Sequence, residues 1–172
     1  MAAPALPVPK VIGDKRPEIS YRERSAARVV AFNNAGEVAV VYAKREQYYK
    51  LSGGGIDTGE QHEEAVLREM QEETDGIIKI RSHLGCVAVT EEYRHDLHQM
   101  SYCYVADVDD SGSPNLIAKE INDGLGHLWM PVDEAKSKMA EAEPRSELGL
   151  SIKGRDIYRL DEATRCAEKG GA

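Results

Sequence analysis

The sequence lacks an excess of basic residues. Its 22 Lys and Arg are outnumbered by 30 Asp and Glu, which gives a formal net charge of -8. Nucleic acids and anionic lipids are held mainly by clustered Lys and Arg, so neither a nucleic acid nor a membrane surface is expected as a partner. Small anionic substrates remain compatible with this charge, provided that a metal or a few basic side chains neutralise them locally.

Long apolar runs are also missing. No stretch approaches the roughly 18 consecutive apolar residues that a membrane-spanning helix needs. The N-terminal segment MAAPALPVPK lacks the basic start and the continuous apolar core of a secretory signal. With 41% hydrophobic and 30% charged residues, the composition is that of a soluble globular protein, and we expect it in the cytoplasm.

Cysteines are few, and they do not have the spacing of metal ligands. Cys86, Cys103 and Cys166 are an odd number, and two of them fall in apolar, strand-like sequence. Disulfide frameworks and zinc sites need pairs or clusters of cysteines at short, regular spacings. We therefore expect buried thiols in a reducing compartment.

The length of 172 residues favours one domain with a substantial core. Four of the seven prolines lie in the first 17 residues, and prolines in series disfavour a helix or an interior strand. Residues 1–20 are therefore predicted as a flexible tail. Residues 21–168 are predicted as the single domain, and residues 169–172 as a frayed C-terminus.

Strands are predicted to outnumber helices. The first two β-rich runs, 26–32 and 37–43, flank Asn33, Asn34, Ala35 and Gly36, a turn sequence typical of a hairpin. Further strands are predicted at 48–51, 77–89, 100–108 and 126–132. Helices are predicted at 61–74 and 132–142, and residues 147–169 are expected to form a loop followed by a helix. Hairpins with single helices between or after them indicate an α+β fold with a mixed sheet.

The predicted helix at 61–74 carries three glutamates on one face. Glu69, Glu72 and Glu73 are spaced i, i+3 and i+4, beside an apolar stripe made of Val66, Leu67 and Met70. Like-charged neighbours, and acids near a helix C-terminus, cost only a few tenths to about 1 kcal/mol each. That cost is small enough for the three glutamates to be simply a solvated acidic face of the helix. A divalent cation would instead turn the repulsion into attraction, because Mg²⁺ prefers carboxylate oxygens and bridges to phosphates.

The segment directly before this helix, SGGGIDTGE at 52–60, contains four glycines. Consecutive glycines let the backbone approach an ion or a phosphate closely. Alone, such a segment is more often a plain connection. Next to the glutamate face, it favours a site that handles a metal and a phosphate.

Loop and helix together resemble the Nudix box. This motif has a Gly, five residues, a Glu, seven residues, and then Arg-Glu-apolar-x-Glu-Glu-x-Gly-apolar. The run GGIDTGEQHEEAVLREMQEETDG places seven residues in register with it: Gly54, Glu60, Arg68, Glu69, Met70, Glu72 and Glu73. The resemblance implies an α/β/α sandwich around a mixed β-sheet that carries a loop-helix-loop catalytic motif. It also implies metal-dependent hydrolysis of a diphosphate bond in a nucleoside diphosphate derivative or a nucleoside triphosphate.

Carried over residue by residue, the resemblance makes Glu69, Glu72, Glu73 and the carbonyl of Gly54 the ligands of Mg²⁺ or Mn²⁺. Glu60 and Arg68 then support these ligands, and Arg68 lies one turn from Glu72, close enough to orient it. Two positions depart from the motif, because Asp75 stands at the expected Gly and Gly76 at the apolar position after it. We interpret this as a helix end displaced by one residue, since either Asp75 or Gly76 can end the helix.

The sequence offers two candidates for the general base. Family members differ in whether the base lies in the box or on a later loop. Glu69 is one candidate, and Glu120, in a loop shortly before Trp129, is the other. Glu91 and Glu92 are weaker alternatives.

Substrate contacts are predicted for Tyr49, Lys50 and Tyr93. A tyrosine can stack on a base, although strand tyrosines more often pack in the core. A lysine before the glycine loop can touch phosphates. His95 and His98 lack a convincing third zinc ligand, so a zinc site is not expected.

The alternative function is a catalytically inactive Nudix-fold module that binds a nucleotide. Loss of the ligand glutamates would favour it, and all three are present. The resemblance also leaves a homodimer open, because many family members are dimers.

Overall fold

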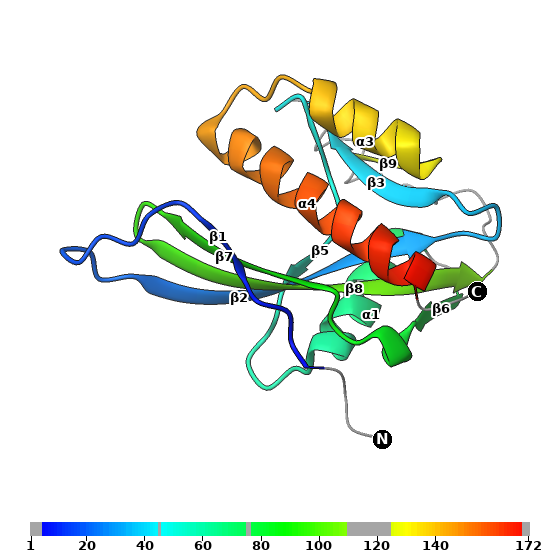
Figure 1. The fold of residues 1–172 in the computed structure, drawn as a ribbon, viewed down its shortest axis with the longest axis horizontal. Helices are drawn as coiled ribbons and strands as arrows, with labels where there is room; N and C mark the ends of the chain where they lie inside the picture. Colours follow the sequence, from blue (N-terminus) through cyan, green and yellow to red (C-terminus); the bar gives the residue numbers. More distant parts are fainter. Residues whose placement is uncertain (1–4, 45, 75–76, 110–124, 170–172) are drawn as a thin grey trace.

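A nine-stranded mixed sheet forms the centre of the computed structural model, which describes residues 5–44, 46–74, 77–109 and 125–169 (Figure 1). The strands are β1 Lys10–Ile12, β2 Arg22–Phe32, β3 Val38–Ala43, β4 Tyr48–Lys50, β5 Ser52–Gly55, β6 Ile77–Ile80, β7 Ala88–Arg94, β8 Leu97–Asp109 and β9 Leu125–Met130. The helices are α1 His62–Thr74, α3 Val132–Glu141 and α4 Glu147–Lys169, with a short 3₁₀ turn, η1, at Ser82–Leu84.

The two longest strands, β2 and β8, lie side by side and run parallel through the middle of the sheet. β7 pairs with β8 as an antiparallel hairpin, and β1 adds to β7 in parallel. On its other side β2 pairs with β5, and further along it meets β3, both antiparallel. Parallel and antiparallel pairs in one sheet confirm the predicted mixed sheet and the α+β class. The hairpin predicted at 33–36 is also confirmed.

Helices cover both faces of the sheet (Figure 1). Alternate residues of β8 point to opposite faces, so that Tyr104 and Ala106 pack toward α1 while Cys103 and Val105 pack toward α3 and α4. These layers are helix, sheet and helix, as the sandwich predicts.

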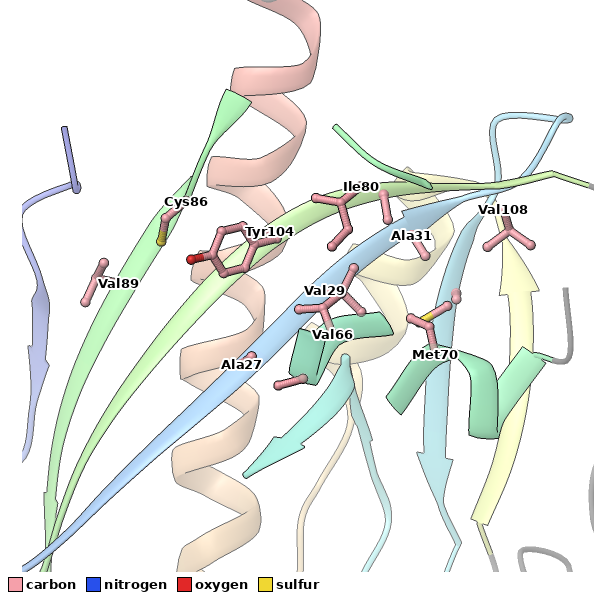
Figure 2. Packing of buried hydrophobic residues seen from close by; sticks show 13 residues of the cluster. Ala27, Val29, Ala31, Val66, Met70, Ile80, Cys86, Val89, Tyr104 and Val108 are labelled. Carbon is pink, nitrogen blue, oxygen red and sulfur yellow. The ribbon is translucent and has the colours of Figure 1, made fainter. Parts of the chain in front are cut away.

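The apolar stripe of α1 packs onto β2 and β8. Val66 and Met70 are fully buried and contact residues such as Val29 and Val108, whose side chains point from the sheet toward the helix (Figure 2). Burial of such a side chain contributes about 1.5–3 kcal/mol. Leu67, predicted as part of the stripe, is instead 41% exposed. The stripe is completed by Ala65, which is fully buried and is small enough to let the helix approach the sheet.

Three predicted boundaries are wrong. The run 77–89 is not one strand, because η1 interrupts it and Gly85 has a φ of 64°. The polar segment 90–99 is not a connection, because β7 and β8 extend through it to a turn at His95, whose φ is 54°. Residues 147–169 form one helix without a preceding loop. Polar cross-strand pairs and long-range packing override the local pattern in these places.

The glycine segment differs as well, since residues 52–55 form β5 rather than a loop. Within the predicted tail, β1 pairs with β7, for example Lys10 with Thr90. The predicted domain boundaries, and the frayed end at 169–172, stay predictions. The displaced helix end at Asp75 and Gly76 lies outside the described residues. None of the described helices is both long and apolar enough to span a bilayer.

Candidate functional site

β5 brings the backbone of the glycine segment against α1. Gly53 has a φ of 134°, and a Cβ there would lie 2.8 Å from the Cα of Arg28 on β2. A Cβ on Gly54 would lie 2.9 Å from Cδ of Glu69, and closer still to its Oε1. Both distances are shorter than van der Waals contact. A side chain at Gly53 would meet the backbone of β2, so that position requires glycine, whereas a side chain at Gly54 would displace the Glu69 carboxylate. The carboxylate of Glu69 therefore lies directly beside the backbone of Gly54.

Arg68 joins the loop, the strand and the helix. Its Nε and Nη2 donate to the two carboxylate oxygens of Glu60, at 2.9 and 3.0 Å. Nη1 donates to Oε1 of Glu69 at 3.0 Å, and Nη2 also donates to the carbonyl of Gly55 at 3.1 Å. The backbone N–H of Asp57 donates to Glu60. A guanidinium that holds one carboxylate with two donors fixes its own orientation, so Arg68 can fix that of Glu69.

Charge in this cluster is locally compensated. The hydrogen bond from Arg68, followed by that from the Asp57 N–H, lowers the pKa of Glu60 to about 2. The same pair raises the pKa of Arg68. Glu60 and Arg68 therefore form a permanent ion pair at neutral pH. Arg68 also forms an ion pair with Oε1 of Glu69 at 3.0 Å, while among the described residues no donor reaches Oε2, which can therefore accept a cation.

The donor set fits Mg²⁺ or Mn²⁺. Both are hard cations that prefer carboxylate and carbonyl oxygens. The predicted ligands Glu69 and Gly54 supply groups of these types and lie next to each other in the structure. Glu72 and Glu73 follow Glu69 on α1 at positions i+3 and i+4, and this spacing shares one face of a helix. Their side chains are outside the described part of the structure. Among described side chains, no three His, Cys, Asp or Glu gather around a metal position.

The structure separates the predicted substrate residues. Tyr49 packs on the face of the sheet opposite α1, in the cluster beneath α3, and its ring lies 4.6 Å from that of Tyr42. Lys50 is partly exposed and pairs with Val41 on β3. The placement of Tyr49 therefore gives its predicted role no support.

Tyr93 contacts Tyr21, Glu91 and His98. Its ring stacks on His98 at 4.7 Å and meets Tyr21 edge-on at 5.3 Å. Its hydroxyl donates to Glu91 at 3.3 Å. Tyr93 therefore already packs against two aromatic rings, and it also lines a pocket beside Tyr21.

The candidate bases also fall into different places. Glu69 lies in the centre just described, whereas Glu120 lies outside the described residues. Glu92 is 2% exposed and pairs with Arg155 of α4 on the opposite face of the sheet. Glu91 pairs with His98 at 2.8 Å. Glu92 is thus excluded by its position.

Sequence reasoning missed His62, the first residue of α1. A hydrogen bond of 2.8 Å joins its Nδ1 to the hydroxyl of Tyr104, and its ring lies 4.3 Å from that of Tyr102. Burial lowers the pKa of His62, so the imidazole is neutral at pH 7. It lines a hollow together with Gln61, Glu63, Glu64 and Tyr104. The sequence gives no signal for His62, because its partners Tyr102 and Tyr104 lie on β8 and meet it only in the folded protein.

Comparisons with known proteins agree with the architecture. The NUDIX domain family model matches residues 22–148, and a search of curated proteins gives no match. Similar solved structures include the MutT protein from Methanosarcina mazei Go1, with a TM-score of 0.56 and 15% identity over 90% of this chain and 100% of that chain. UDP-X diphosphatase has a TM-score of 0.60 and 16% identity, over 90% of this chain and 68% of that one. Ap4A hydrolase from C. elegans has a TM-score of 0.56 and 15% identity, over 88% and 100%.

At these identities the structural likeness shows the fold alone, and it confirms the predicted sandwich. Family membership rests on the family model, which covers most of the chain. The box residues Gly54, Glu60, Arg68 and Glu69, which are separated in sequence, also meet at one point of this fold. The chain belongs to the Nudix family.

Proposed function

We propose that this protein is a metal-dependent hydrolase that cleaves a diphosphate bond by attack of water at phosphorus. Its substrate would be a nucleoside diphosphate derivative or a nucleoside triphosphate. The observation that carries the proposal is the carboxylate of Glu69, seated on the backbone of Gly54 and held by Arg68. Nudix hydrolases generally use a divalent metal and small nucleotide substrates. The neighbours named as a UDP-X diphosphatase and an Ap4A hydrolase support a nucleoside diphosphate derivative.

The chemistry requires neutralised phosphate oxygens, an activated water and a stabilised leaving phosphate. Mg²⁺ or Mn²⁺ held by Gly54, Glu69, Glu72 and Glu73 would supply the positive charge and lower the pKa of a bound water. Arg68 holds Oε1 of Glu69 in one orientation, so that Oε2 points to a constant place. Glu60 in turn fixes Arg68, and this keeps the donor geometry set before substrate arrives.

The oxygens of Glu69 are already committed, and this favours Glu120 as the general base. Oε1 of Glu69 already accepts from Arg68, and as a metal ligand Glu69 would commit Oε2 to the cation. That leaves Glu69 poorly placed to take a proton from water. Glu120 carries no such commitment in the proposal, while Glu69 stays the alternative base.

Substrate contacts outside the centre are proposed for Lys50, as a phosphate contact, and for Tyr93, as a ring on which a base could stack. The hollow beside His62 adjoins the N-terminal end of α1 and offers a neutral imidazole and a tyrosine hydroxyl. We also place the protein in the cytoplasm, since its three cysteines are free thiols. Homodimerisation stays a prediction.

The test is a panel of substrates incubated with Mg²⁺, with a matched series in EDTA. The panel contains dinucleotides, nucleotide sugars, dinucleoside polyphosphates and oxidised nucleoside triphosphates. We expect Mg²⁺-dependent release of two phosphate-bearing products from at least one class. Measurable binding without turnover of any class would instead support the inactive nucleotide-binding module.

A further inference from the structure

A cluster of charged side chains is buried on the face of the sheet away from α1. Arg155, Asp156 and Arg159 of α4 are at most 3% exposed, as is Glu92 of β7, and Arg28 of β2 is 8% exposed. Buried charges are costly unless they are paired and hydrogen-bonded. The contacts of this cluster therefore indicate what its charges hold in place.

Asp156 is the centre of the cluster. Its Oδ1 accepts from Nη1 of Arg159 at 2.8 Å and from Nε of Arg155 at 3.3 Å. The two arginines continue to β7, where Arg155 donates to Glu92 at 2.9 Å and Arg159 donates to Thr90 at 2.6 Å. This oxygen of Asp156 thus orients two arginines of α4, and the arginines anchor the helix to β7.

The other oxygen of Asp156 reaches the glycine strand. The backbone N–H of Leu51, at the junction of β4 and β5, donates to Oδ2 at 2.8 Å. From β2, Nη1 of Arg28 donates to the carbonyl of Gly53 at 2.9 Å. On the opposite face, Arg68 donates to the carbonyl of Gly55. Charged side chains from α4, β2 and α1 therefore hold the backbone on both sides of Gly54.

β5 needs such external support. Its sequence is Ser-Gly-Gly-Gly, so three of its four residues have no side chain to pack, and glycine loses the most backbone freedom on ordering. Burial raises the pKa of Asp156, but the charges of Arg155, Arg159 and Arg28 and the Leu51 N–H outweigh burial and lower it overall. Asp156 therefore remains an ionised acceptor at neutral pH.

We propose that Asp156 and Arg28 are positioning residues, which fix β5 so that Gly54 and Glu69 keep the geometry of the metal centre. This inference rests on the proposed function for its consequence, although the fixing of β5 can be measured by itself. Neither residue touches the reacting atoms. Their effect would pass through the backbone of Leu51 and Gly53.

The experiment compares Asp156→Asn and Arg28→Met with Thr90→Val. Asp156→Asn leaves a single acceptor oxygen for the Leu51 N–H and the two arginines, and Arg28→Met removes the donor to the Gly53 carbonyl. Thr90→Val removes a hydrogen bond of the same cluster that does not reach β5, so it is the control for stability alone. Each variant is measured by thermal melting, by calorimetric titration with Mn²⁺ below the melting temperature, and by hydrogen exchange at the amides of residues 53–55.

We expect Asp156→Asn and Arg28→Met to weaken Mn²⁺ binding by about 10-fold to 100-fold, the usual effect of losing a residue that supports metal ligands. Exchange at residues 53–55 should become faster in both. Thr90→Val should lower the melting temperature while Mn²⁺ affinity and exchange at β5 stay unchanged. If one variant fails to fold, the other still supplies the comparison.

Mn²⁺ affinity and β5 exchange in both variants equal to those of Thr90→Val would overturn the inference and leave a purely structural cluster. If the wild-type protein binds no Mn²⁺, the proposed function fails separately. The exchange measurement then decides whether Asp156 and Arg28 fix β5.

Discussion

Replacing Gly54 with alanine tests the geometry of the centre directly. An ideal Cβ at this position lies 2.9 Å from Cδ of Glu69, whereas ordinary contact begins at 3.4 Å. The carboxylate must therefore move outward by at least about 0.5 Å. Metal-ligand distances tolerate only about ±0.2 Å, so the displaced carboxylate no longer completes the site.

A misplacement of about 1 Å costs on the order of 10²-fold in rate, and we expect Gly54→Ala to lower Mg²⁺-dependent kcat/KM by about 10-fold to 100-fold. Mn²⁺ affinity should fall with it. The fold should persist, because the group in the way is the flexible end of a side chain. Circular dichroism and thermal melting check the fold, and calorimetry and initial rates check the site.

Gly55→Ala is the matched control, since it makes the same change one residue along β5. Its Cβ would lie nearest to Nη2 of Arg24, at 3.2 Å, so a shift of the guanidinium by about 0.2 Å would restore ordinary contact. We expect a distinctly smaller loss than for Gly54→Ala. Equal losses in rate and metal affinity for the two variants would refute the placement of Glu69 over Gly54.

Four further predictions follow from single side chains. Glu73→Gln should lower turnover by at least about 10²-fold in a folded protein, because it removes a predicted ligand charge; near-normal initial rates would mean that the ligand set is misplaced. Glu120→Gln should flatten the pH-rate profile if Glu120 takes the proton, and an unchanged profile points to Glu69. Because folding lowers the pKa of Glu60 from 4.5 to about 2, its ion pair with Arg68 contributes stability above about pH 4.5 and loses it as pH falls toward 2. Denaturant melts of Glu60→Gln should accordingly show a flatter profile over that window, and a slope like that of the wild type would contradict the ion pair. Gly154→Ala should stabilise α4 by about 0.5–1 kcal/mol, since nothing lies within 4 Å of the added Cβ; a lower melting temperature would mean that the position is crowded.

The sequence already indicates that Gly54, Glu60, Arg68 and Glu69 lie together, because the box is local. The helix at 61–74, the glycine approach and the contact of Arg68 with an acid all depend on residues within about one loop and one helix. Arg68 contacts Glu60 and Glu69, whereas the spacing pointed to Glu72, whose side chain lies outside the described part of the structure. The bidentate pair with Glu60 depends on the loop conformation, which residue spacing alone does not specify.

Features that depend on distant partners could not be predicted. Asp156 meets Leu51 across 105 residues, and no periodicity in either segment indicates this contact. α4 contains Gly149 in its first turn, where the sequence predicts a loop, and an added Cβ there would lie 2.7 Å from Cβ of Pro144 and 3.0 Å from Tyr48. Long-range packing of this kind overrides local propensity.

The central claim is that water attacks a diphosphate phosphorus at a metal centre built on Glu69 and Gly54. It is tested most directly by turnover in ¹⁸O-labelled water with Mg²⁺, with products read by mass spectrometry. We predict one ¹⁸O atom in one of the two phosphate-bearing products, and loss of the labelled product in EDTA and in Glu69→Gln. Labelled product formed at the same rate without Mg²⁺, or in Glu69→Gln, would contradict the account.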